Sequence, residues 1–356
     1  DEFMRAVEDD ADVELRYPVD SDEPVMKETV RANDIWDEII SSAHKTAEPG
    51  LLFWDTAKKL TPSDIYADEG FGSISTNPCG EIILSAYDSC RLMLVNLSSL
   101  VDRPFKKNSR FNFKKMSEIS HKAQRLMDDM IDLEIEQIDK ILEKIVSDPE
   151  PSRVKKIERD LWNNIKNQAI KGRRTGLGVT AVGDTLAALN IRYGSDESID
   201  IVEKIYKTLT VSAYRSSCIM AKERGPFPIH DFDMGATVDF VDDMGDKWQE
   251  YDVYHHGFNR WRDSLTIPEG KTMSYEDLEA LSPYHKSTSN DIDWIQKVKL
   301  QAAAQKWICH AISNTTNVPS DTDISTVKDI YMQGWKLGCK GVTVYRDGSR
   351  SGVLIS

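Results

Sequence analysis

The sequence contains few cysteines and no closely paired cysteine motif. Its five cysteines are an odd number spread over 356 residues, and no CxxC occurs among them. This pattern argues against a disulfide framework and against a zinc knuckle, and no iron or zinc site is visible in the chain. Free thiols are typical of a reducing compartment, so we expect a cytoplasmic protein.

Long apolar runs and an excess of basic residues are also absent. No apolar run approaches the roughly 20 residues that a membrane-spanning helix needs. Lys and Arg number 45 against 59 Asp and Glu, which gives a net charge of −14. We therefore expect no membrane insertion and no nucleic acid as the main partner. The chain is long enough to bury a sizeable core, and it opens without a signal peptide, as if cut from a longer protein.

Hydrophobic periodicity predicts helices that alternate with short strands. The expected helices are 1–9, a helix capped by Asn33 and stopped by Pro49, 116–146, 153–169, 182–189, 195–224, 291–312 and 325–337. The expected strands are 13–19, 51–54, 91–101, 315–318 and 341–345, with a hairpin over 236–256, whereas 25–30 has no clear pattern. This alternation is typical of an α/β protein with a largely parallel sheet.

The stretch Thr76-Asn77-Pro78-Cys79-Gly80-Glu81 carries the most chemistry. Proline pushes the preceding residue toward extended geometry, and glycine permits close approach. In an extended backbone, residues two apart point to the same side, so an amide, a thiol and a carboxylate would be presented together. The alternative is a simple Asn-Pro turn with a small buried cysteine and a solvated glutamate.

Other features carry weaker signals. The stretch 173–180 (RRTGLGVT) lacks the spacing of a phosphate-binding loop, so its glycines indicate close backbone packing. Cys309 falls on the apolar face of an expected helix and is interpreted as a packing residue. His255 and His256 are adjacent without partners at metal-ligand spacing, which favours a polar surface role.

With its NPCGE stretch, the chain resembles the catalytic subunit of ribonucleotide reductases. The similarity extends over 55–101, 173–228 and 300–352, and the closing GCKGVTVYRDGSRSG is most similar to the adenosylcobalamin-dependent class II branch. This resemblance implies a ten-stranded α/β barrel, partial in this chain, with 76–81 as its central finger loop. It also implies reduction of ribonucleoside di- or triphosphates to deoxyribonucleotides.

The resemblance implies roles for four residues. Cys79 matches the cysteine that becomes a thiyl radical, Glu81 the general base for the 3′-hydroxyl, and Asn77 the amide that hydrogen-bonds the ribose hydroxyls. Pro78 and Gly80 complete the substrate-binding loop. Cys90, eleven residues after Cys79, matches half of a redox pair that a thioredoxin-like dithiol or the enzyme's own C-terminal cysteines would restore.

Tyr345 bears on the source of the radical. Class I enzymes carry two adjacent tyrosines in the similar region, whereas Tyr345 is followed by Arg346. The single tyrosine favours adenosylcobalamin as cofactor, and Tyr345 itself is expected to be an interior strand residue whose hydroxyl finds a partner. The resemblance further allows a dNTP effector and a homodimer, and family members occur in bacteria, archaea and their viruses.

The chain departs from the family pattern in three places. We expect one catalytic barrel domain over 1–356 that is incomplete, because the N-terminal part with the partner cysteine, a segment near 232–235 and a C-terminal tail are missing. Three alternatives stay open: a class I-type subunit that receives its radical from a metal-containing partner, a hydrolase with Cys79 as nucleophile, and an inactive remnant that needs a partner to complete the barrel.

Overall fold

The computed structural model describes residues 2–19, 21–59, 61–230, 240–241, 247–248 and 292–349. The α-helices and two 3-10 helices (η) are α1 (Glu2–Glu8), α2 (Ala32–Thr46), α3 (Trp54–Lys59), η1 (Pro62–Glu69), η2 (Leu97–Leu100), α4 (Phe113–Ser147), α5 (Ser152–Gly172), α6 (Val182–Ala188), α7 (Asp196–Arg224), α10 (Trp294–Gln305) and α11 (Ile324–Lys336). The strands are β1 (Asp12–Tyr17), β2 (Met26–Arg31), β3 (Leu51–Leu52), β4 (Ser75–Thr76), β5 (Ile83–Leu84), β6 (Met93–Asn96), β7 (Val101–Asp102), β8 (Arg110–Phe111), β9 (Leu177–Thr180), β10 (Phe240–Val241), β11 (Lys247–Trp248), β12 (Thr315–Val318) and β13 (Gly341–Arg346).

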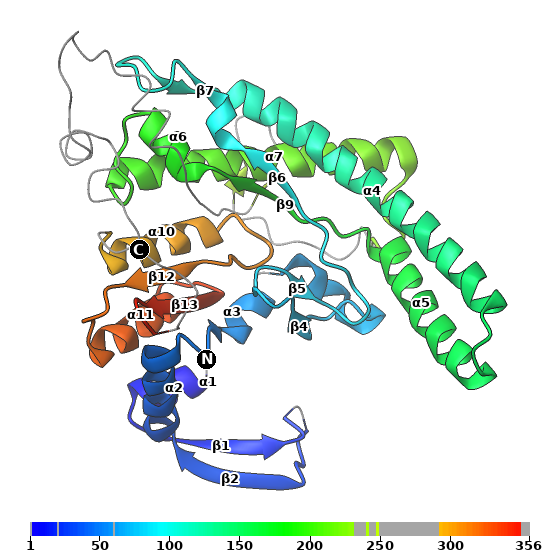
Figure 1. Cartoon of the computed structure of the whole chain (residues 1–356), viewed down its shortest axis with the longest axis horizontal. Helices are drawn as coiled ribbons and strands as arrows, with labels where there is room; N and C mark the ends of the chain where they lie inside the picture. The colour runs from blue at the N-terminus through cyan, green and yellow to red at the C-terminus, as the bar shows by residue number, and fades with distance from the viewer. Residues whose placement is uncertain are drawn as a thin grey trace.

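One hydrophobic core forms around β12, β13 and β3 (Figure 1). β12 and β13 run parallel, and β3 pairs antiparallel with β13. Helices α1, α2, α10 and α11 contribute buried side chains to this core. Trp36 of α2 and Tyr331 of α11 are fully buried and meet edge to face, with ring centroids 6.3 Å apart.

A second core lies around the parallel pair β6 and β9. Helices α4, α6 and α7 and the 3-10 helix η2 contribute buried side chains to it, including Met116 of α4 and Ile205 of α7. In the sequence, the segment from η1 to β5 follows the N-terminal elements of the first core and precedes the elements of the second core. It carries the functional stretch identified above.

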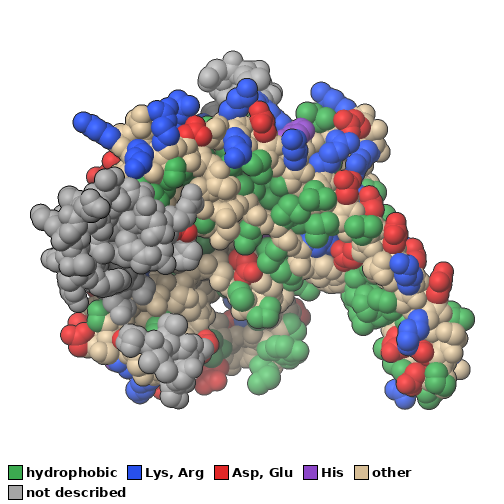
Figure 2. Space-filling view, turned by 45° about the horizontal axis from the view of Figure 1, so that its top comes forward, with side chains coloured by type: hydrophobic (Ala, Val, Ile, Leu, Met, Phe, Trp, Pro, Cys, Tyr) green, Lys and Arg blue, Asp and Glu red, His purple; other side chains and the backbone are tan. Residues whose placement is uncertain are grey.

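The strands of the described residues form sheets of two or three strands, and they do not close into a barrel. Parallel pairing is confined there to β6 with β9 and β12 with β13. The expectation of a largely parallel sheet was therefore only partly correct, because short hairpin connections produce antiparallel pairs such as β1 with β2. The ends of α4 and α5 extend as an arm over which acidic, basic and apolar side chains are interspersed (Figures 1 and 2).

Most expected helices and strands are confirmed, with boundaries corrected by local polar groups. Asn33 is not an N-cap: α2 starts at Ala32, and the Asn33 amide donates to Val7 O and Asp10 Oδ1. The strand expected over 91–101 is only β6, because the Asn96 side chain accepts a hydrogen bond from Ser98 N and starts η2.

Two further strands and one helix also differ from their expected boundaries. The strand expected over 51–54 is shortened to β3 because Trp54 begins α3, and the unassigned stretch 25–30 contains most of β2. The helix expected over 291–312 is shorter: α10 is capped by Asp293 and ends at Gln305.

Some expectations fall on parts of the chain that the structure does not describe. The hairpin expected over 236–256 is described only where β10 pairs antiparallel with β11. His255, His256 and the segment 232–235 lie outside the described residues, as do Asp291 at the start of the helix expected over 291–312 and the chain after Ser349.

Candidate functional site

The stretch 76–81 forms the turn of a small β-hairpin between β4 and β5. Asn77 N donates to Ile82 O over 3.1 Å, and Gly80 N donates to Asn77 O over 3.0 Å. The Asn77 side chain closes the turn as well, because its Oδ1 accepts a hydrogen bond from Ile82 N over 2.9 Å. The expected extended loop is therefore a closed turn, in which Gly80 adopts a φ of 82°.

The turn places its acid and its thiol differently. Glu81 is half-buried and lines a cavity of about 610 Å³, and its Oε2 is buried without a hydrogen-bond partner among the described residues. Cys79 is exposed and does not line this cavity. The structure thus directs the carboxylate of Glu81 inward and leaves the thiol of Cys79 accessible at the tip of the hairpin.

The cavity lies between the hairpin and the second core. Its size is typical of a small-molecule site. Residues from η1, β6, β9, α7 and the segment after α10 line it, including Ser63, Tyr66, Leu92, Leu94, Arg174, Leu177, Val179, Tyr214, Phe227, Cys309 and His310. The mixture of apolar walls with a few polar groups suits a molecule that has both apolar and polar parts.

The segment 308–311 fixes the base of the hairpin. Ala311 N donates to Glu81 O over 2.9 Å, and Ile83 N donates to His310 Nδ1 over 3.3 Å. Burial, together with the positive charges of Arg174 and Lys340, lowers the pKa of His310 to about 3. This imidazole is therefore neutral at physiological pH and acts as a hydrogen-bond acceptor.

A fully buried lysine holds the same segment from behind. The Lys340 Nζ donates to the carbonyl oxygens of Ile308, Cys309 and His310 at 3.4, 2.7 and 3.1 Å. Burial lowers its pKa to about 8. The sequence analysis missed Lys340, although a lysine at the start of an apolar strand was a signal that a buried partner had to exist.

The structure brings Cys90 close to the hairpin. The pKa of the Cys90 thiol is raised by burial and, to a smaller extent, by the negative charges of Glu81 and Cys79. Cys90 is therefore within electrostatic reach of both hairpin residues. Both cysteines are free, and Cys90 is exposed.

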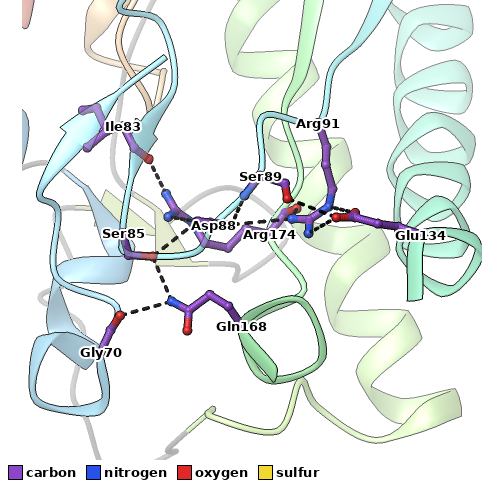
Figure 3. Close-up of polar contacts among 9 residues, drawn as sticks. All are labelled: Gly70, Ile83, Ser85, Asp88, Ser89, Arg91, Glu134, Gln168 and Arg174. Atoms are coloured by element: carbon purple, nitrogen blue, oxygen red, sulfur yellow. Dashed lines mark hydrogen bonds and ion pairs between the residues drawn. The ribbon is translucent and has the colours of Figure 1, made fainter. Parts of the chain in front are cut away.

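Charged residues surround the segment that carries Cys90 (Figure 3). Arg91, directly after the cysteine, forms an ion pair with Glu134 of α4. Asp88, two residues before it, forms an ion pair with Arg174. These side chains come from elements far apart in the sequence, so the sequence alone did not reveal their cluster.

Two interpretations of single residues change. Cys309 is not on the face of a helix, because α10 ends at Gln305; it lines the cavity, with its Sγ 2.9 Å from the Tyr214 hydroxyl. Tyr345 lies buried in β13 as expected, but its hydroxyl has no hydrogen-bond partner among the described residues. The prediction that this hydroxyl finds a hydrogen-bond partner is therefore wrong within the described part of the chain.

The described residues contain neither a metal-binding cluster nor a membrane-spanning helix. In the described parts of the chain, no group of three or more His, Cys, Asp or Glu side chains is arranged to hold a metal ion. Within the same residues, none of the helices combines the length and apolar character needed to cross a bilayer.

Comparisons with known proteins show the family to which the chain is similar. The sequence matches the family described as ribonucleotide reductase, barrel domain, over residues 1–281 and 263–345. A vitamin B12-dependent ribonucleoside-diphosphate reductase of Mycobacterium tuberculosis is 27% identical over 398 residues, covering 100% of this chain and 52% of the relative. One from Thermoplasma acidophilum is 27% identical over 400 residues, covering 99% of this chain and 47% of the relative.

A solved structure shows the same fold. The class Id ribonucleotide reductase alpha subunit of Actinobacillus ureae superposes with a TM-score of 0.57 at 18% identity, covering 89% of this chain and 61% of that subunit. The chain spans about half the length of the two B12-dependent relatives described above.

Proposed function

The chain belongs to the ribonucleotide reductase barrel-domain family, and from that premise we propose that it is the part of a class II enzyme that carries the radical cysteine. The enzyme would reduce ribonucleotides to 2′-deoxyribonucleotides. The observation that supports this most is the hairpin 76–81, where the unpartnered carboxylate of Glu81 lines a cavity of about 610 Å³ and the free thiol of Cys79 is exposed in the same turn. The diphosphate form is favoured as substrate because two of the relatives are ribonucleoside-diphosphate reductases.

Each residue of the turn has a distinct role in this proposal. The Cys79 sulfur, as a thiyl radical, takes the hydrogen atom from C3′ of the ribose and returns it at the end of the cycle. Glu81 accepts the proton of the 3′-hydroxyl, which its unpartnered Oε2 is free to do. The Asn77 Oδ1 is already bonded to Ile82 N, so its NH2 group is the part that donates to a ribose hydroxyl.

Cys90 supplies reducing equivalents. Together with a partner cysteine from outside this chain, it would give up two electrons and two protons and become a disulfide. A thioredoxin-like dithiol would then restore both thiols by exchange. Cys90 lies near Cys79 and Glu81, and both residues raise its pKa. This proximity supports the assignment.

Adenosylcobalamin is the proposed radical source. The names of the B12-dependent relatives favour it, and the exposed position of Cys79 leaves room for a bulky group to approach the thiol. The cavity that Glu81 lines has the size of a small-molecule site, and Cys79 lies outside its lining. When bound, the cofactor would supply the radical, and the chain's own residues would orient and deprotonate the ribose.

The alternatives are separable. A class I-type subunit would be active with a metal-containing partner and without adenosylcobalamin. A cysteine hydrolase would need a histidine base, and His310, which contacts the hairpin, has Nδ1 bonded to Ile83 N and a pKa of about 3. That histidine is a poor base near neutral pH. An inactive remnant would turn over only when an N-terminal fragment is added.

The test is reduction of cytidine and adenosine diphosphates by the full-length protein, with and without adenosylcobalamin. We expect product only with the cofactor. A Cys90→Ser variant should lose multiple turnover with a dithiol reductant. Product formed without cofactor, or dependent on a metal-containing partner, would contradict the class II assignment.

A further inference from the structure

The residues on both sides of Cys90 are anchored to helix α4 by one carboxylate. The Ser89 hydroxyl donates to Glu134 Oε1 over 3.0 Å, and Arg91 Nη2 donates to the same oxygen over 3.1 Å. Arg91 Nε also contacts Glu134 Oε2. Figure 3 shows Ser89 and Arg91 both directed toward Glu134. The backbone around Cys90 is thereby fixed at two points that flank the thiol.

A second ion pair connects the same segment to the hairpin. The Asp88 carboxylate is almost fully buried and contacts Arg174 Nη1, while its Oδ1 lies 3.6 Å from Arg91 Nη1. Arg174 Nη2 donates to Ile83 O over 2.8 Å, two residues after Glu81. A continuous chain of contacts therefore runs from α4 through the Cys90 segment to strand β5 (Figure 3).

The four charges of this cluster cancel. Asp88 and Glu134 are acidic, Arg91 and Arg174 are basic, and each guanidinium is bonded to a carboxylate of the cluster. Arg91 is adjacent to Cys90 in sequence, yet its guanidinium is held toward α4. Burial raises the pKa of Cys90 most, and the hairpin residues Glu81 and Cys79 raise it further.

We propose that Asp88, Arg91, Glu134 and Arg174 are positioning residues for Cys90, which fix its backbone relative to the Cys79 hairpin and withhold the Arg91 charge from its thiol. The inference rests on the proposed function only in treating Cys90 as the exchanging cysteine. A thiol held protonated beside the hairpin can deliver hydrogen to the substrate, and its attack on outside disulfides is kept slow because the thiolate is the nucleophile.

The test is the pH dependence of Cys90 alkylation by iodoacetamide in the full-length protein, followed by peptide mass spectrometry. Glu134→Gln gives the cluster a net charge of +1, and we expect the pKa of Cys90 to fall by roughly half a unit, so that alkylation at pH 7.5 becomes about threefold faster. The double variant E134Q/R91M restores neutrality and should return the rate to that of the wild type. Asp132→Asn is the matched control: it removes one acid from α4 that pairs with Arg173 outside the cluster.

The proposal is overturned if E134Q leaves the rate unchanged, if the double variant stays fast, or if D132N accelerates Cys90 equally. If E134Q does not fold, Arg91→Met serves as the test. It gives the cluster a net charge of −1 and should slow the alkylation of Cys90. An unchanged or faster rate would overturn the proposal as well. Alkylation does not depend on turnover. A failure here, with turnover still dependent on Cys90, leaves the proposed function intact.

Discussion

Gly176 packs directly against the backbone of Arg91. A Cβ atom at position 176 would lie 2.2 Å from the Arg91 carbonyl oxygen, and Gly176 O accepts a hydrogen bond from Met93 N over 3.1 Å. The glycines of the 173–180 stretch therefore serve close packing, as the sequence analysis predicted. This contact fixes the residue that follows Cys90 against the strand that precedes α6.

Gly176→Ala should destabilise the protein by about 1–3 kcal/mol, because the added methyl group forces the Arg91 backbone to move. Urea unfolding measures the change. Gly72→Ala is the milder control, since its nearest contact is the Ala67 side chain at 3.3 Å. Equal effects of the two substitutions would show that the contact with Arg91 is not tight.

Glu81→Gln should lower turnover by roughly 100- to 10,000-fold, because an amide cannot accept the proton of the 3′-hydroxyl. Stability should not fall, since Oε2 has no hydrogen-bond partner among the described residues. Nucleotide reduction and urea unfolding are measured on the same preparation. Full activity in this variant would remove Glu81 from the mechanism.

Two substitutions at Asn77 separate its roles. Asn77→Ala loses the bond to Ile82 N and should cost about 1 kcal/mol of stability, whereas Asn77→Asp keeps an acceptor for that bond and should cost less. Both variants lose the NH2 donor, so both should reduce turnover. If Asn77→Asp is fully active, donation from Asn77 to the ribose is not required.

Stability should depend on pH through His310. Its folded pKa of about 3 lies below the ordinary value of 6.5, so protonation favours the unfolded chain, and the stability present above pH 6.5 is lost as the pH falls. Between pH 6.5 and 5 the loss should amount to roughly 2 kcal/mol. His310→Gln should flatten this part of the profile in urea unfolding. An unchanged slope would mean that His310 is protonated in the folded protein.

The sequence was sufficient where the signal is local. The helical periodicity of 116–146 predicted α4, and that of 195–224 predicted α7. That Asn77, Cys79 and Glu81 share one loop could be proposed from their spacing alone, although in the structure Glu81 lines the cavity and Cys79 is exposed outside it. The geometry of this loop could not be proposed, because the Asn77 side chain bonds within the turn and closes it.

The rest depends on contacts between distant segments. Lys340 supports Cys309 from 31 residues away, and Arg91 meets Glu134 from 43 residues away. Buried charges such as these are paired with residues that only the tertiary structure brings close. The hydrophobic periodicity of the sequence carries no information about these pairs. Cys309 illustrates the same limit: its place in the cavity follows from the end of α10 at Gln305, which no terminating proline or glycine marks.

The radical role of Cys79 is tested most directly by one measurement, deoxyribonucleotide formation by the full-length Cys79→Ala variant in the presence of adenosylcobalamin and dithiol. The control is Cys218→Ala, which removes another exposed free thiol, located on α7. We predict no detectable product from Cys79→Ala and unchanged turnover from Cys218→Ala. Product from the Cys79→Ala variant at the rate of the wild type would contradict the account.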